Sequence, residues 1–106
     1  MPCIKGRLPD KQYNKIRSNY KYLEAEIKHD PMGLARSLFQ YHVFDDDDLE
    51  KIKREERRHD GGKTEAAAKL LDILLNCGSM AYENFIKALD DNGYLNALLR
   101  LEPGKI

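Results

Sequence analysis

Four consecutive aspartates, Asp45 to Asp48, are the densest group of potential metal ligands in the sequence. A calcium loop alternates its ligands with other residues and holds a glycine at a fixed position. The segment DDDDLEKIKREE does neither, so we expect no metal site. Aspartates ahead of a helix accept hydrogen bonds from its free N–H groups and favour its positive end. Two interpretations of the run remain open, namely helix capping with solvation and contact with a partner protein.

A catalytic cysteine would need a general base close to it. The cysteines are Cys3 and Cys77, and the histidines are His29, His42 and His59. The histidines fall in predicted loops or helix ends, and no oxyanion motif accompanies them. The cysteines form no disulfide framework and no zinc-binding spacing. We therefore expect no catalytic residue, no metal and no cofactor, and we interpret Cys77 as a half-buried structural thiol.

Nucleic-acid binding is a third possible chemistry, and the basic segment Lys51 to Lys63 is its candidate. Lysine and arginine supply phosphate contacts, and aromatic side chains commonly stack on bases. Glu55 and Glu56 interrupt the segment, which contains no aromatic residue. The nucleic-acid signal is therefore weak, and a solvated helix face or a protein contact is the favoured explanation of the segment. A small helical nucleic-acid-binding domain using Lys51–Lys63 therefore remains the alternative function.

The composition indicates one small domain. The chain has 106 residues, of which 42% are hydrophobic and 34% charged. This length is enough for a single modest core. No signal peptide and no membrane-spanning apolar run is present. A reducing, cytoplasmic location is the default expectation.

The formal net charge is zero, yet charges of one sign cluster along the chain. Residues 1–29 carry seven bases against three acids, and residues 30–50 carry six acids against Arg36 alone. Residues 51–63 are again basic, and residues 64–106 are slightly acidic. The pattern suits a protein with one acidic and one basic surface. It also suits an ordinary soluble surface, and composition does not separate the two interpretations.

The stretch from Thr64 to Gly93 predicts two amphipathic helices joined by a turn. Its apolar residues recur at the i, i+3, i+4, i+7 spacing of a buried helical face. In the first half these are Ala67, Leu70, Leu71 and Leu74, and in the second half Tyr82, Phe85, Ile86 and Leu89. Thr64 is the expected cap of the first helix, which runs to about Asn76, and Ser79 of the second, which runs to about Asp91.

The rest of the chain predicts four more helices. One runs from Asp10 to about His29 with Tyr13, Ile16, Tyr20, Leu23 and Ile27 on its apolar face. Asp30-Pro31 starts the next, which buries Leu34, Ala35, Leu38 and Phe39. The aspartate run caps a short third helix with Leu49 and Ile52 buried, and HDGGK at 59–63 forms a loop. The last helix spans Tyr94 to Leu101. With no alternating strand pattern, the fold class is all-α, a six-helix antiparallel bundle.

This pattern resembles a caspase recruitment domain (CARD), a branch of the death-fold superfamily. The resemblance is carried by Leu38-Phe39, Val43-Phe44, LEKI at 49–52, AAKLL at 67–71, Leu74, Gly78, FIKAL at 85–89, Gly93-Tyr94 and residues 95–101. The expected domain spans residues 9–103, with a flexible lead at 1–8 and a tail at 104–106. The chain is most similar to the CARDs of apoptosome scaffolds and initiator caspases.

The resemblance implies a non-enzymatic adaptor that binds another CARD-containing protein, such as a caspase, scaffold or adaptor. It implies association between a basic surface on the first and fourth helices and an acidic surface on the second and third. The matching basic residues here are Arg17, Lys21, Lys63 and Lys69, and the acidic ones are Asp46, Asp47, Asp48 and Glu50. Apoptosis or innate immune signalling is the implied setting, with self-assembly as a further expectation.

Two positions depart from the family pattern. Tyr20 stands where a basic residue is common in the first helix, and Arg36 stands where some scaffold CARDs place an acid. Arg36 shifts the expected acidic surface from the second helix to the aspartate run. The loop after the third helix is expected to be long and basic, with Lys53, Arg54, Arg57 and Arg58.

Overall fold

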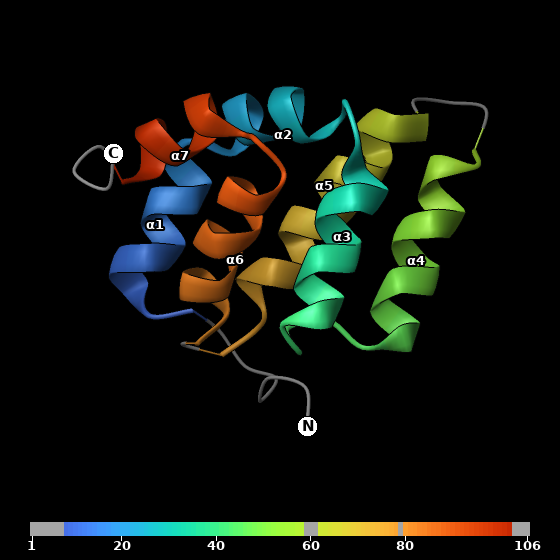
Figure 1. The fold of residues 1–106 in the computed structure, drawn as a ribbon, viewed down its shortest axis with the longest axis horizontal. Coiled ribbons are helices and arrows are strands. Elements are labelled where there is room, and N and C mark those ends of the chain that lie inside the picture. The colour runs from blue at the N-terminus through green and yellow to red at the C-terminus, as the bar shows by residue number, and fades with distance from the viewer. Residues whose placement is uncertain (1–7, 59–61, 79, 103–106) are drawn as a thin grey trace.

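The computed structural model describes residues 8–58, 62–78 and 80–102. These residues form a helical bundle and contain no β-strand, which agrees with the expected all-α class (Figure 1). The helices are α1 Asp10–Ser18, α2 Tyr20–Ile27, α3 Pro31–Gln40, α4 Asp46–Glu56, α5 Gly62–Leu75, α6 Met80–Asp91 and α7 Leu95–Leu101. Helix α5 packs against α2, α3 and α4, while α6 packs against α3 and α7.

The first expected helix is two helices, so the described chain has seven helices where the sequence predicted six. The break is at Asn19, whose backbone lies at φ −109° and ψ 15°. Its N–H donates to the carbonyl of Ile16 at 3.1 Å, and its side-chain amide donates to the carbonyl of Lys15 at 2.8 Å. Asparagine side chains compete in this way with regular helical bonds. Helix α2 then restarts at Tyr20 and turns away from α1.

The core is built mainly from the predicted apolar faces, although Leu49, which was expected to be buried, is only half-buried. Each of the eight apolar positions predicted for the faces of the helices within residues 64–93 is buried, which confirms the two amphipathic helices. Ile16, Leu23 and Ile27 from α1 and α2 join them, and Tyr13 and Tyr20 pack half-buried at the edge. Phe39 was wrongly expected inside, because it is 39% exposed at the end of α3. Leu8 is also buried, and its N–H donates to the Leu75 carbonyl at 3.3 Å. The domain boundaries at residues 9 and 103 stay a prediction.

Capping residues and a glycine turn set where several of the helices begin and end. Asp30 caps α3 by accepting a hydrogen bond from the Gly33 N–H, with Pro31 in the first turn. Gly93 has φ +76° and ends the turn between α6 and α7, a conformation that favours glycine. Helix α5 already begins at Gly62, ahead of the predicted cap Thr64. The predicted cap Ser79 and most of the predicted 59–63 loop lie outside the described residues.

Candidate protein-interaction surface

Three of the four predicted acidic residues are exposed on α4, where Asp46 and Asp47 stand in the first turn and Glu50 one turn later. The carboxylate of Asp47 is 3.2 Å from the Lys51 ammonium, and that of Glu50 is 3.9 Å from the Lys53 ammonium. Exposed pairs of this kind contribute about 0–1 kcal/mol each, so a partner's cations can replace Lys51 and Lys53. The exposed face of α4 therefore offers carboxylates that are only loosely engaged.

Asp48, the fourth predicted acidic residue, is 3% exposed. Its carboxylate accepts a hydrogen bond from the Asp45 N–H at 3.1 Å, while Asp45 accepts one from the Asp48 N–H at 2.9 Å. The two residues form a reciprocal capping box at the start of α4. The aspartate run thus divides, because Asp45 and Asp48 cap the helix while Asp46 and Asp47 face solvent. Asp48 is used inside the fold and is not available to a partner.

The four predicted basic residues come from three helices. Arg17 near the end of α1 and Lys21 in the first turn of α2 are both exposed, on either side of the break at Asn19. Lys63 is exposed at the start of α5, whereas Lys69 is half-buried further along it. Six residues of α-helix correspond to roughly 240° of rotation at 3.6 residues per turn. Lys63 and Lys69 therefore lie on different sides of α5.

Lys69 lies in a shallow groove between α4 and α5. The groove is lined by Asp48, Lys51, Lys69, Asp72, Ile73 and Asn76. Lys69 is therefore close to Lys51 of α4 and to the exposed acid Asp72 of its own helix. Asp48 is the one predicted acidic residue among those lining residues, and it is buried. Asp46, Asp47 and Glu50, the exposed members of the predicted acidic surface, do not line the groove.

Tyr20 links α2 to this region. Its hydroxyl donates to the Asp72 carboxylate at 2.9 Å and lies 3.1 Å from the Ala68 carbonyl. Burial, followed by the hydrogen bond to Asp72, raises the pKa of Tyr20 well above its usual value. The hydroxyl stays protonated and keeps donating at neutral pH. Tyr20, which departs from the family pattern by carrying no charge, thus holds α2 against α5.

Arg36 is exposed on α3. The basic stretch expected in a loop is partly helical, because α4 continues to Glu56 and so includes Lys53 and Arg54. Arg58 lies after the helix and pairs with Glu55 at 3.2 Å. Charged residues within α4 pair at i+3 and i+4 spacing, which adds a small stabilisation to the helix.

The described residues form no catalytic cysteine site and no metal site. Cys77 is fully buried, and its Sγ lies 3.3 Å from the Ile73 carbonyl. His29 and His42 are exposed, and His59 falls outside the described part of the chain. No group of three or more histidine, cysteine, aspartate or glutamate side chains there is placed to hold a metal ion. None of the helices described is both long and apolar enough to span a bilayer.

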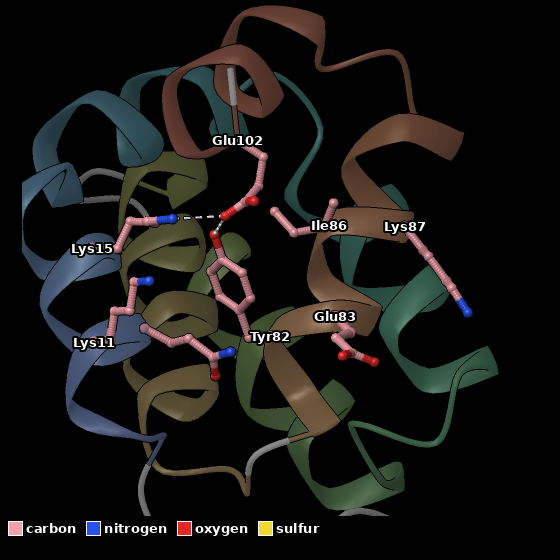
Figure 2. A pocket seen from close by; sticks show the side chains of 8 residues that line it. Lys11, Lys15, Tyr82, Glu83, Ile86, Lys87 and Glu102 are labelled. Atoms are coloured by element: carbon pink, nitrogen blue, oxygen red, sulfur yellow. Dashed lines mark hydrogen bonds and ion pairs between the residues drawn. The ribbon is translucent and has the colours of Figure 1, made fainter. Parts of the chain in front are cut away.

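A hollow of about 510 Å³ lies between α1 and α6 (Figure 2), and no sequence pattern predicted it. Its walls are Lys11, Gln12, Lys15, Tyr82, Glu83, Ile86, Lys87 and Glu102. The Glu102 carboxylate, directly after α7, accepts hydrogen bonds from the Lys15 ammonium at 2.7 Å and the Tyr82 hydroxyl at 2.5 Å. The i, i+4 spacing of Lys11 and Lys15 was visible in the sequence, but their partners come from remote segments.

Comparison with known proteins identifies a family for this chain. The family model described as caspase recruitment domain matches residues 13–102. No curated protein and no solved structure matches the chain. The matched span covers all seven helices except the first three residues of α1, and it contains each of the predicted surface residues. The chain therefore belongs to the caspase recruitment domain family.

Proposed function

We propose that this domain recruits a caspase or a signalling adaptor through homotypic CARD–CARD association, in the cytoplasm and in apoptosis or innate immune signalling. CARDs are protein-interaction domains that bind other CARD or death-fold proteins and are generally non-enzymatic. The match over residues 13–102 carries the proposal. Within the family, apoptosome scaffolds and initiator caspases are the proposed relatives. The nucleic-acid alternative is not favoured, since Lys51, Lys53 and Arg58 of the basic segment pair with acids of α4.

The proposed contact joins a basic surface of one CARD to an acidic surface of the next. The basic surface comprises Arg17, Lys21, Lys63 and Lys69, with Lys63 and Lys69 on different sides of α5. The acidic surface comprises Asp46, Asp47 and Glu50. The exposure of all but the half-buried Lys69 supports this assignment. Because the two surfaces differ, the contact is heterologous, and it extends into a helical assembly when its rotation does not close. A partner CARD can take either role.

Several weak ion pairs of this kind affect register and association rate more than affinity. Screening lengths are about 10 Å at 0.1 M salt, so association should weaken as ionic strength rises. The pairs of Asp47 with Lys51 and of Glu50 with Lys53 compete with the partner. A partner that contributes several cations in fixed positions overcomes this competition.

Charge reversal on each surface tests the proposal. Asp47→Lys and Lys69→Glu should each abolish self-association of the purified domain, measured by sedimentation velocity at low salt. A mixture of the two variants should associate, because each keeps the surface that the other has lost. The matched control is Lys28→Glu, an exposed lysine after α2, which should assemble normally. Unchanged helical circular dichroism must accompany each variant, and normal assembly of both reversed proteins alone would refute the electrostatic contact.

A further inference from the structure

The hollow between α1 and α6 holds a carboxylate in a polar clamp. Figure 2 shows Glu102 reaching down from the end of α7 to meet Lys15 of α1 and Tyr82 of α6. Lys15 and Glu102 are 32% and 25% exposed, and the Tyr82 residue is 5% exposed. Charge-assisted hydrogen bonds in such half-buried places are stronger than those between exposed groups. The clamp recognises a carboxylate with one ammonium and one hydroxyl.

The hollow has more cationic and polar capacity than Glu102 uses. Lys11 lies one turn before Lys15 on the same face of α1, and neither Lys11 nor Lys87 has an ion-pair partner within the described ranges. Figure 2 shows the ammonium of Lys87 directed away from Tyr82. The side-chain oxygen of Gln12 is buried without a hydrogen-bond donor among the described residues. A buried polar atom without a partner costs stability until a donor reaches it.

The tyrosine is suited to donate. Burial, followed by the hydrogen bond from Tyr82 to Glu102, raises the pKa of Tyr82 far above its usual value. Its hydroxyl therefore stays protonated throughout the neutral range. Its ring and Ile86 supply the apolar part of the wall. The site combines a carboxylate clamp with an adjacent apolar contact.

Glu102 can leave this clamp without unfolding the bundle. It follows the last residue of α7, and its own N–H donates to the Leu98 carbonyl at 2.7 Å. The end of a helix is the part that frays most readily. When Glu102 swings out, the lining residues Lys11 and Lys15 oppose only Glu83 among the lining acids. The vacated site then has a net positive charge.

We propose that this hollow binds an acidic peptide segment of a partner protein, and that Glu102 occupies the site as an internal competitor. A glutamate or aspartate of the segment replaces the Glu102 carboxylate on Lys15 and Tyr82. A neighbouring apolar side chain packs on Ile86, and a peptide N–H reaches Gln12. The site contains none of the α4 carboxylates of the proposed CARD contact, whereas Arg17 of the proposed basic surface lies on α1 two residues after Lys15.

The test uses the probe acetyl-Leu-Glu-Leu-Glu-amide, titrated into the nitrogen-15-labelled domain and followed by nuclear magnetic resonance. The wild-type protein should show shifts centred on Lys11, Lys15 and Tyr82. Glu102→Gln should raise the affinity by about tenfold or more, because a charge-assisted hydrogen bond of the competitor is lost. The matched control Glu83→Gln removes a lining acid that does not engage Lys15, and should change the affinity by less than about threefold.

Two further measurements test the proposed peptide site even if Glu102→Gln destabilises α7. Lys11→Gln, which breaks no contact described with Glu102, should weaken binding to the otherwise unchanged protein. Acetyl-Leu-Gln-Leu-Gln-amide, which lacks carboxylates, should not bind. Equal binding of the two peptides, shifts centred elsewhere, or no binding to any of these proteins would overturn the proposal. Asp47→Lys should leave peptide binding intact, which separates this site from the proposed CARD contact.

Discussion

Asp48 is the one charged residue that is buried in the described part of the chain. Its carboxylate and that of Asp45 satisfy each other's backbone N–H groups, which would otherwise lack partners at the start of α4. Asp47, next to it, is 75% exposed at its side chain and pairs with Lys51. Asp48 therefore caps the helix while Asp47 faces solvent, because successive residues of a helix are rotated by about 100°.

Substitution of these neighbours should separate the two roles. Asp48→Ala should lower the free energy of unfolding by about 1–2 kcal/mol, because it removes half of the capping box. The matched change Asp47→Ala should alter the free energy of unfolding by no more than about 0.5 kcal/mol, as is usual at exposed positions. Urea unfolding followed by circular dichroism measures both. Equal effects of the two substitutions would show that the capping box adds nothing.

At the scale of elements, the turns decide how the helices meet. Asn19 divides the first amphipathic stretch into α1 and α2, and Tyr20 then fastens α2 to α5. Gly93 lets α7 return beside α6, with the Tyr94 N–H donating to the Leu89 carbonyl at 2.9 Å. A Cβ at Gly93 would have no heavy atom within 4 Å. Any cost of replacing this glycine therefore comes from its backbone conformation alone.

Substitutions at Gly93 measure the free-energy cost of a left-handed conformation in a residue other than glycine. Gly93→Ala should destabilise the domain by about 1–2 kcal/mol, because a left-handed conformation is strained for alanine. Gly93→Asn should cost less, since asparagine tolerates this region better. Both variants should retain the helical spectrum, and thermal unfolding gives the ranking. An alanine variant as stable as the wild type would contradict the left-handed turn.

At the scale of the whole molecule, phenolic hydroxyls tie remote segments together. Tyr20 reaches α5, Tyr82 reaches Glu102, Tyr41 reaches Asp91, and Tyr94 reaches the Asp30 carbonyl. The pKa values of all four are raised. For Tyr20, Tyr82 and Tyr94 the first cause is burial, and for Tyr41 it is the hydrogen bond to Asp91. Each of these bonds requires the protonated phenol.

These ties predict sensitivity to alkaline pH. The unfolded tyrosines ionise near their ordinary pKa of about 10, while Tyr20 and Tyr82 in the folded protein stay protonated to higher pH. Their stabilisation is complete below pH 10 and declines as the pH rises above it, because the unfolded state then binds fewer protons. The Tyr20→Phe, Tyr82→Phe double variant should lose stability less steeply between pH 10 and 11 in urea titrations. Tyr22→Phe, whose ring packs on Arg100, is the control, and an unchanged slope in the double variant would count against the ties.

The sequence by itself determined the fold class and the family. The periodic apolar positions of α5 and α6 and the caps at Asp30 and the aspartate run are local patterns, and local patterns are set by helix geometry. They predicted the burial of Leu70, Phe85 and their neighbours. They also placed Arg17, Lys21 and the α4 carboxylates on charged segments whose role in binding remains a prediction.

Only the tertiary structure decided which charges meet. The break at Asn19 arises because its side-chain amide competes with backbone N–H groups for a helical carbonyl. The spacing of apolar residues along the sequence does not reveal this competition. The burial of Asp48, the Lys69–Asp72 edge of the α4–α5 groove, and the tie from Tyr20 to Asp72 each depend on helix rotation and packing. The clamp of Lys15, Tyr82 and Glu102 joins residues up to 87 positions apart. Contacts over such separations arise from how whole helices pack, and a pattern read along the chain does not contain that information.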